Sequence, residues 1–120
     1  MSVSSQKKKT WAALSRLWCA LHPVCQICHE KPSNQTHHII PRARGNSVYF
    51  HGHNLLAVCA GCHMEWHNRM DPDTQVKIAH REQTDFQKVL DVQYQHKKFT
   101  VDELKQMERY FKNELEAMND

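Results

Sequence analysis

Residues 59–67 read Cys59-Ala60-Gly61-Cys62-His63-Met64-Glu65-Trp66-His67, and this stretch decides the fold class. It joins a C-x-x-C pair to two histidines spaced four residues apart. We expect a helix from about Gly61 to Met70, and residues four apart on a helix share one face. Two imidazoles on that face can bind one metal ion, and the thiols can contribute to a separate site. The stretch therefore predicts a helix that serves two metal sites.

A second C-x-x-C pair, Cys25-Gln26-Ile27-Cys28, lies thirty residues upstream. Two such pairs complete a tetrahedral shell of thiolates, which selects Zn2+. Redox-active C-x-x-C motifs and buried free cysteines are the alternatives. The βαβ pattern of a thioredoxin-like redox site is missing. The sequence thus predicts one structural zinc, bound by Cys25, Cys28, Cys59 and Cys62. Cys19 falls within an expected helix and is interpreted as a core thiol.

The insert between the pairs is poor in helical periodicity and contains two short predicted strands, Thr36–Ile40 and Leu55–Val58. His37 and His38 are adjacent on the first strand, so their side chains point in opposite directions. One of them can bind a metal while its neighbour does something else.

Size and composition indicate one soluble domain. The chain has 120 residues with 40% hydrophobic and 24% charged residues, and 10 histidines are its unusual count. Residues 1–70 carry eight Lys and Arg against two Glu, a net charge of +6. Residues 71–120 carry eight against eleven acidic residues, a net charge of −3. A polyanion is therefore expected to bind the first part, which holds the Cys and His clusters.

The N-terminal region is interpreted as a flexible basic arm, residues 1–10, followed by an amphipathic helix over 11–21. Arg16 interrupts the apolar stretch, which argues against a signal peptide. No apolar run approaches the length of a membrane span. We expect a cytoplasmic, reduced protein, which favours metal over disulfides at the cysteines.

Residues 71–120 are predicted to form a helical tail that packs on the core or mediates dimerisation. Asp71-Pro72 ends the preceding helix, because a residue before proline avoids the α region. Thr84–Gln87 fits a capping box that splits the next helical stretch in two. A second capping box, Thr100–Glu103, begins the final helix. That helix carries an apolar stripe interpreted as core packing: Val101, Leu104, Met107, Phe111, Leu115 and Met118.

The combined pattern resembles the zinc-bearing form of the HNH, or ββα-metal, endonuclease motif. It consists of His37-His38-x-x-Pro41, Asn54-Leu55 and Cys59-x-x-Cys62-His63-x-x-x-His67, within residues 25–68. The resemblance implies an α+β fold with a small ββα-metal core, flanked by helices and active on DNA. It implies that His38 is the general base and that Asn54 braces the loop carrying it. It further implies that His37 and His63 bind one catalytic divalent metal, with His67, or in exchange Asn68, completing the set.

The ligand set departs from many relatives, which have Asp in place of His37 and Asn in place of His63. An all-imidazole set is softer and suits Mn2+, Ni2+, Co2+ or Zn2+ better than Mg2+. The order of core, helical stretch and basic segment also resembles, more weakly, the lambdoid phage NinG (Rap) recombination endonucleases, which act on branched DNA.

The sequence therefore predicts a metal-dependent endonuclease that binds DNA mainly through phosphates. Its candidate DNA-binding residues are Arg42, Arg44, Lys97 and Lys98. A non-catalytic zinc-stapled DNA-binding module and a restriction or homing endonuclease are the alternatives. The complete set of base and ligands favours an enzyme over the first. The short region after the core leaves little room for the specificity region of the second.

Overall fold

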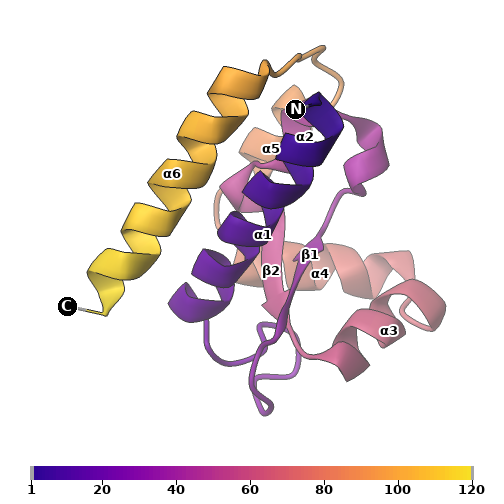
Figure 1. The fold of residues 1–120 in the computed structure, drawn as a ribbon. Helices are drawn as coiled ribbons and strands as arrows, with labels where there is room; N and C mark the ends of the chain where they lie inside the picture. The colour runs from indigo at the N-terminus through magenta and orange to yellow at the C-terminus, as the bar shows by residue number, and fades with distance from the viewer. Residues whose placement is uncertain (1, 120) are drawn as a thin grey trace.

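The computed structural model describes residues 2–119 and combines helices with one two-stranded antiparallel sheet (Figure 1). The predicted α+β class is therefore confirmed. No helix in the described part is long and apolar enough to span a bilayer. The main elements are α1 (Val3–Leu21), β1 (Gln35–His38), α2 (Asn46–Tyr49), β2 (Leu55–Val58), α3 (Ala60–Asn68), α4 (Pro72–Glu82), α5 (Phe86–Val92) and α6 (Val101–Met118).

Helix α1 begins at Val3, so the expectation of a flexible arm was wrong for residues 3–10. Ser2 caps the helix, its hydroxyl accepting a hydrogen bond from Ser5 N at 3.1 Å. Gln6 and Thr10, which read as solvated residues in the sequence, are buried. The hydroxyl of Thr10 donates to the carbonyl of Leu104 in α6 at 2.8 Å. Contacts with α6 thus stabilise the helical conformation of this polar segment, and the local sequence does not reveal them.

The sheet pairs β1 with β2 and sets the position of the histidines. His37 lies opposite Leu56, and His38 lies opposite Leu55. All four residues of β2 are buried, which places the sheet inside the molecule. The predicted second strand has the observed bounds, whereas β1 ends at His38 and not at Ile40. Beyond His38 the chain leaves the ladder, because the N–H groups of Ile39 and Ile40 donate to the backbone and side-chain oxygens of Asn54.

The tail contains the helices expected after residue 71. Asp71 caps α4 by accepting from Thr74 N at 3.2 Å, with proline in the first turn. Helix α5 begins one residue later than the predicted capping box requires. Its cap is Asp85, which makes no side-chain capping bond, so the Thr84 box is absent. At α6 the predicted box is present: Thr100 accepts from Glu103 N, and Glu103 accepts from Thr100 N, both at 3.1 Å.

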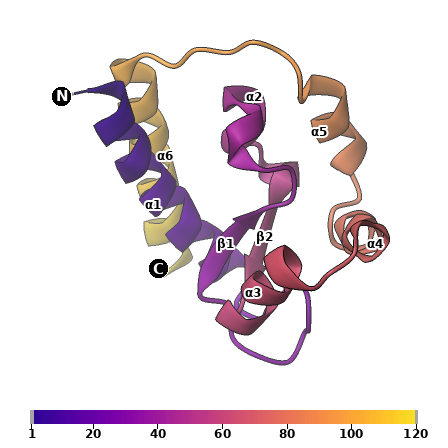
Figure 2. The ribbon, with the colours of Figure 1, turned by 90° about the vertical axis from the view of Figure 1, so that its right-hand side faces the viewer.

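Helix α6 lies along α1, and both views show the two helices side by side (Figures 1 and 2). Leu104 is fully buried, and the rest of its apolar stripe is half-buried except for exposed Met118. An extended segment links α5 to α6 across the top of Figure 2. Helix α6 therefore packs against the body of the protein through α1, whereas α4 and α5 contribute residues directly to the core.

Candidate functional site

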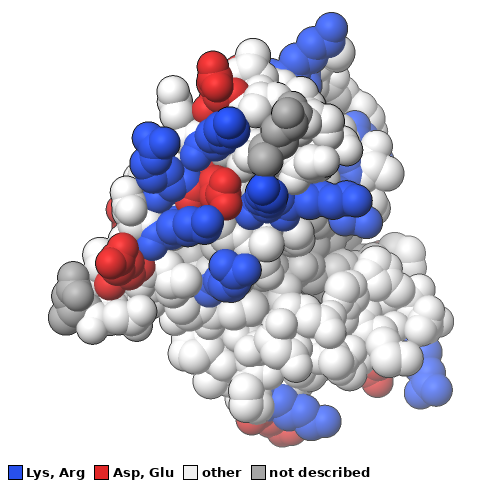
Figure 3. All heavy atoms as spheres, viewed as in Figure 1, with Lys and Arg blue, Asp and Glu red and all other residues white. Residues whose placement is uncertain are grey.

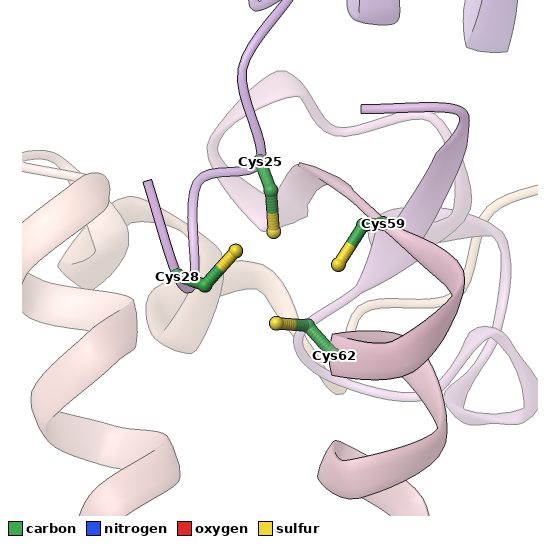
Figure 4. Close-up of side chains that lie close together, drawn as sticks. All are labelled: Cys25, Cys28, Cys59 and Cys62. Atoms are coloured by element: carbon green, nitrogen blue, oxygen red, sulfur yellow. The ribbon is translucent and has the colours of Figure 1, made fainter. Parts of the chain in front are cut away.

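The four cysteines of the two C-x-x-C pairs converge in space. Their Sγ atoms lie within 4.8 Å of one another and point toward a common centre (Figure 4). All are free thiols, and Cys19 is outside the cluster. Tetrahedral Zn–S bonds of about 2.3 Å require sulfurs roughly 3.8 Å apart, which fits this spacing. The four cysteines are positioned to bind a metal, as predicted.

The thiols differ in their electrostatic surroundings. Backbone N–H groups of Lys31 and Glu30 hydrogen-bond to the Cys28 sulfur and lower its pKa to about 6. Burial raises the pKa of Cys62. A buried thiol of this kind becomes a thiolate only beside a positive charge. The cluster therefore suits a soft divalent cation.

The knuckle that carries Cys25 and Cys28 is fixed by neighbouring elements. Gln26 accepts from Ala57 N of β2 through its side chain at 2.8 Å. Arg81 of α4 donates to the carbonyls of Gln26 at 2.9 Å and Ile27 at 3.1 Å. Two elements, β2 and α4, thus hold this segment in place. The cysteines belong to an apolar core that includes Trp66 and Ile78.

A second cluster contains His37 from β1 and His63 and His67 from α3. Their ring nitrogens lie within 4.8 Å of one another, and the ring centroids are 5.0–5.1 Å apart. Strand β1 pairs with β2, and β2 is followed directly by α3. One short ββα unit therefore supplies all three rings. The structure thus brings together the three histidines predicted as metal ligands.

Hydrogen bonding leaves nitrogens of this cluster available. The Nε2 atom of His37 is buried and, among the described residues, has no hydrogen-bond partner. An unpaired buried nitrogen is costly unless something binds it. His63 Nδ1 donates to the side-chain oxygen of Gln35, which leaves His63 Nε2 unprotonated and free to coordinate. This donor chemistry fits a metal ion.

The same environment keeps the His37 and His63 rings neutral. Burial, followed by repulsion from His63 and His67, lowers the pKa of His37 to about 3. Burial also lowers the pKa of His63, with a smaller effect from His67. Neutral imidazole is the form that binds metals, so these rings are in the binding form at physiological pH.

His38 faces a different set of neighbours. Its ring stacks on Trp11 of α1, with centroids 4.4 Å apart and planes at 20°. Its Nε2 lies 2.8 Å from the carbonyl oxygen of Tyr49. A carbonyl only accepts, so Nε2 carries the proton and Nδ1 is left with a lone pair. Burial is the main cause that lowers the pKa of His38, so this lone pair is available at neutral pH.

Asn54 is fully buried and ties together the loop between the strands. Its Oδ1 accepts from Ile40 N at 2.7 Å. Its Nδ2 donates to the carbonyls of Ile40 at 2.9 Å and Val48 at 3.1 Å. The side chain therefore holds the segment after His38 against α2, the helix that supplies the Tyr49 carbonyl.

One surface hollow brings the two histidine environments together. Its wall includes Trp11, His37, His38, Arg42, His63 and His67. Of the four residues predicted to contact DNA, Arg42 lies in this wall. Arg44 points elsewhere, packing its guanidinium 4.8 Å from the Tyr94 ring centroid. Lys97 and Lys98 lie in the exposed segment before α6, where Lys97 sits 5.1 Å from the Phe99 ring centroid.

Three residues of this region escaped sequence analysis. Gln35 precedes His37 by two positions on β1, so the period of a strand would place both on one face. Gln75 of α4 lines the hollow and donates to the carbonyl of Trp66 at 2.7 Å. Trp11 reaches His38 across 27 positions of sequence, and nothing in its local pattern indicates this contact.

Comparison with known proteins identifies one region of the chain. Residues 25–69 match the family model described as HNH endonuclease. The matched region, just over a third of the chain, contains both cysteine pairs and all three clustered histidines. Neither curated proteins nor solved structures give a match. The comparisons support an HNH domain and nuclease activity at family level, and they give no support to the NinG (Rap) resemblance.

Proposed function

We propose, on the premise that residues 25–69 form an HNH domain, that this protein is a metal-dependent DNA endonuclease. One observation carries the proposal. A cluster of three histidines with available nitrogens shares a hollow with His38, whose Nδ1 is free to accept a proton. Metal-assisted phosphodiester hydrolysis uses a base to activate water and a cation beside the reacting phosphate.

His38 acts as the general base in this proposal. Its Nδ1 takes a proton from a water molecule as the water oxygen attacks phosphorus and the bond to the leaving oxygen breaks. The hydrogen bond from Nε2 to Tyr49 O fixes the tautomer that makes this transfer possible. Asn54 acts indirectly, because it holds the loop that presents the Tyr49 carbonyl.

His37, His63 and His67 would hold the catalytic ion. A divalent cation there supplies neutralisation of charge on the phosphoryl oxygens and on the leaving oxygen. Three imidazoles favour Mn2+, Ni2+, Co2+ or Zn2+ over Mg2+. Cys25, Cys28, Cys59 and Cys62 would hold a separate, structural zinc.

DNA would bind through its phosphates. Arg42 lies in the wall of the hollow and is the candidate contact nearest the cleaved bond. Arg44, Lys97 and Lys98 would contact phosphates farther out. Branched recombination intermediates are one candidate substrate, and a non-catalytic zinc-stapled DNA-binding module is the competing function.

The test is cleavage of linear, nicked, forked and four-way DNA with Mn2+, Ni2+, Co2+, Zn2+ or Mg2+. We expect cleavage by the wild type and a loss of roughly 10²–10⁴-fold in His38→Ala, the usual value of general-base catalysis. DNA binding and thermal unfolding of this variant should match the wild type. His80→Ala is the control, because His80 is exposed on α4 and outside the hollow. Binding without cleavage under every metal would favour the non-catalytic module.

A further inference from the structure

A cationic surface lies outside the region that matches the HNH family. It follows the junction of α1 and α6, where a shallow hollow contains four cations and two carboxylates. We call this surface the α1–α6 face. Its charged members are Lys9, Lys105, Arg109, Lys112, Glu108 and Glu116. Figure 3 shows Lys and Arg side chains gathered over these two helices.

The carboxylates neutralise only part of this positive charge. Glu108 is committed within the protein: it pairs with Lys112 at 2.8 Å and accepts from Gln6 at 2.8 Å. Among the described residues, Lys9, Lys105 and Arg109 form no ion pair. Positions 105, 109 and 112 follow helical spacing, so α6 presents its cations as one stripe. A line of cations of this kind can contact successive negative charges along an extended polyanion.

Helix α1 connects this face to the candidate catalytic hollow. Lys7 and Lys9 are two residues apart, so they project about 200° apart around the helix. Lys7 points to the catalytic side, with its ammonium 4.0 Å from the Tyr49 ring centroid. Lys9 points to α6. Lys8, between them, is exposed. Positive charge therefore continues around the exposed side of α1 from Arg42 to α6.

We propose that the α1–α6 face binds the phosphate backbone of duplex DNA beside the cleaved site. The inference rests on the proposed nuclease function and adds a second contact surface to it. Duplex DNA carries one negative charge per about 1.7 Å of its axis. The longest dimension of the protein, 39 Å, corresponds to about 11 base pairs at roughly 3.4 Å each. A duplex of that length can contact both surfaces at once.

The test compares two triple variants that remove the same charge. Lys9→Gln, Lys105→Gln and Arg109→Gln together neutralise the α1–α6 face without breaking an ion pair. The control combines Lys31→Gln, Lys77→Gln and Lys88→Gln, exposed cations away from this face. Affinity for a 30-base-pair duplex is measured from low to physiological salt without added divalent metal. Circular dichroism and thermal unfolding check the fold of both variants.

For the face variant we expect about tenfold weaker DNA binding. The salt slope, which is the slope of the logarithm of the binding constant against the logarithm of the salt concentration, should be smaller in magnitude by roughly 2–3, about 0.9 per lost phosphate contact. The control should change far less. Equal slopes in the two variants, or in the face variant and the wild type, would overturn the proposal. Cleavage is scored separately. If the face variant has the wild-type salt slope and the wild type cleaves DNA, only the proposal for this face is wrong. If the face variant has a reduced slope and the wild type cleaves no DNA, only the nuclease proposal is wrong.

Discussion

The indole of Trp11 lies flat against the imidazole of His38, with ring centroids 4.4 Å apart and planes at 20°. Trp11 also meets Tyr49 edge-on at 5.6 Å. The ring proposed as general base is thus held between an aromatic of α1 and the backbone of α2. Helix α1 lies outside residues 25–69, so this chain adds its own wall to the HNH domain.

Trp11 should affect catalysis through the position of His38. We expect Trp11→Ala to lower kcat by roughly tenfold, since misplacing a reacting group by about 1 Å is costly. KM and the affinity of the His37 cluster for Mn2+ should change little. Trp11→Phe, which keeps a flat ring, should restore most of kcat. Equal losses in both variants, or a loss confined to KM, would argue against a positioning role.

Asn54→Ala should destabilise the protein by about 3 kcal/mol. The substitution leaves the buried N–H and carbonyl of Ile40 without partners, at about 1–3 kcal/mol each. It also removes one of the hydrogen bonds to the Val48 carbonyl, which still accepts from His51 N. Urea unfolding followed by tryptophan fluorescence measures the change. Asn46→Ala is the control, because it removes hydrogen bonds with the Lys7 ammonium and the Lys97 carbonyl, and neither residue is buried. An unfolding free energy equal to that of the control would contradict the bracing role.

The cysteine cluster should contain one zinc per chain. Replacing any of the four with serine should release the ion and unfold the core, because the sulfurs pack with buried Leu56, Val58 and Trp66. Metal analysis and circular dichroism measure both effects. Cys19→Ser should retain zinc and fold, since its sulfur contacts Thr36 and not the cluster. Loss of zinc in Cys19→Ser, with zinc retained in the four other variants, would contradict the assignment of the ligands.

Acid should destabilise the folded protein through His37. Its pKa is about 3 in the fold and 6.5 in the reference state, so the unfolded chain binds more protons between these values. The free energy of unfolding should fall as pH drops through this window, by at most about 1.4 kcal/mol per pH unit from this residue. His37→Gln should show a shallower dependence between pH 7 and 5. Parallel curves for both proteins would show that His37 does not titrate on unfolding.

A mild chelator should separate the two metals. Three histidines leave open positions on the catalytic ion, whereas four thiolates enclose the structural one. We expect cleavage to stop at a chelator concentration that leaves zinc content and the unfolding temperature unchanged. Added Mn2+ should then restore cleavage. Cleavage that persists with only the thiolate-bound zinc present would exclude a second ion from the reaction.

Local spacing made the cysteine cluster and the histidine cluster predictable. The C-x-x-C pairs and the four-residue interval between His63 and His67 impose their geometry through short segments. The β2 bounds followed from turn residues around an apolar run. By contrast, Gln6 and Thr10 are buried by a helix about a hundred residues away, and Trp11 meets His38 across the fold. Polarity in sequence could not reveal such contacts, which depend on how elements pack.

The pairing of α1 with α6 also has a consequence for when its contacts can form during synthesis. Gln6 and Glu108, which are hydrogen-bonded, are 102 positions apart. Contacts of such separation form late, because the loop-closure entropy must be paid before they stabilise the chain. On the ribosome, the α6-facing side of α1 therefore waits until residues 101–118 have emerged. The two cysteine pairs and the contacts of Trp11 with His38 and Tyr49 lie within the first 62 residues and do not need α6. The buried contacts of Gln6 and Thr10 form only after α6 has been made.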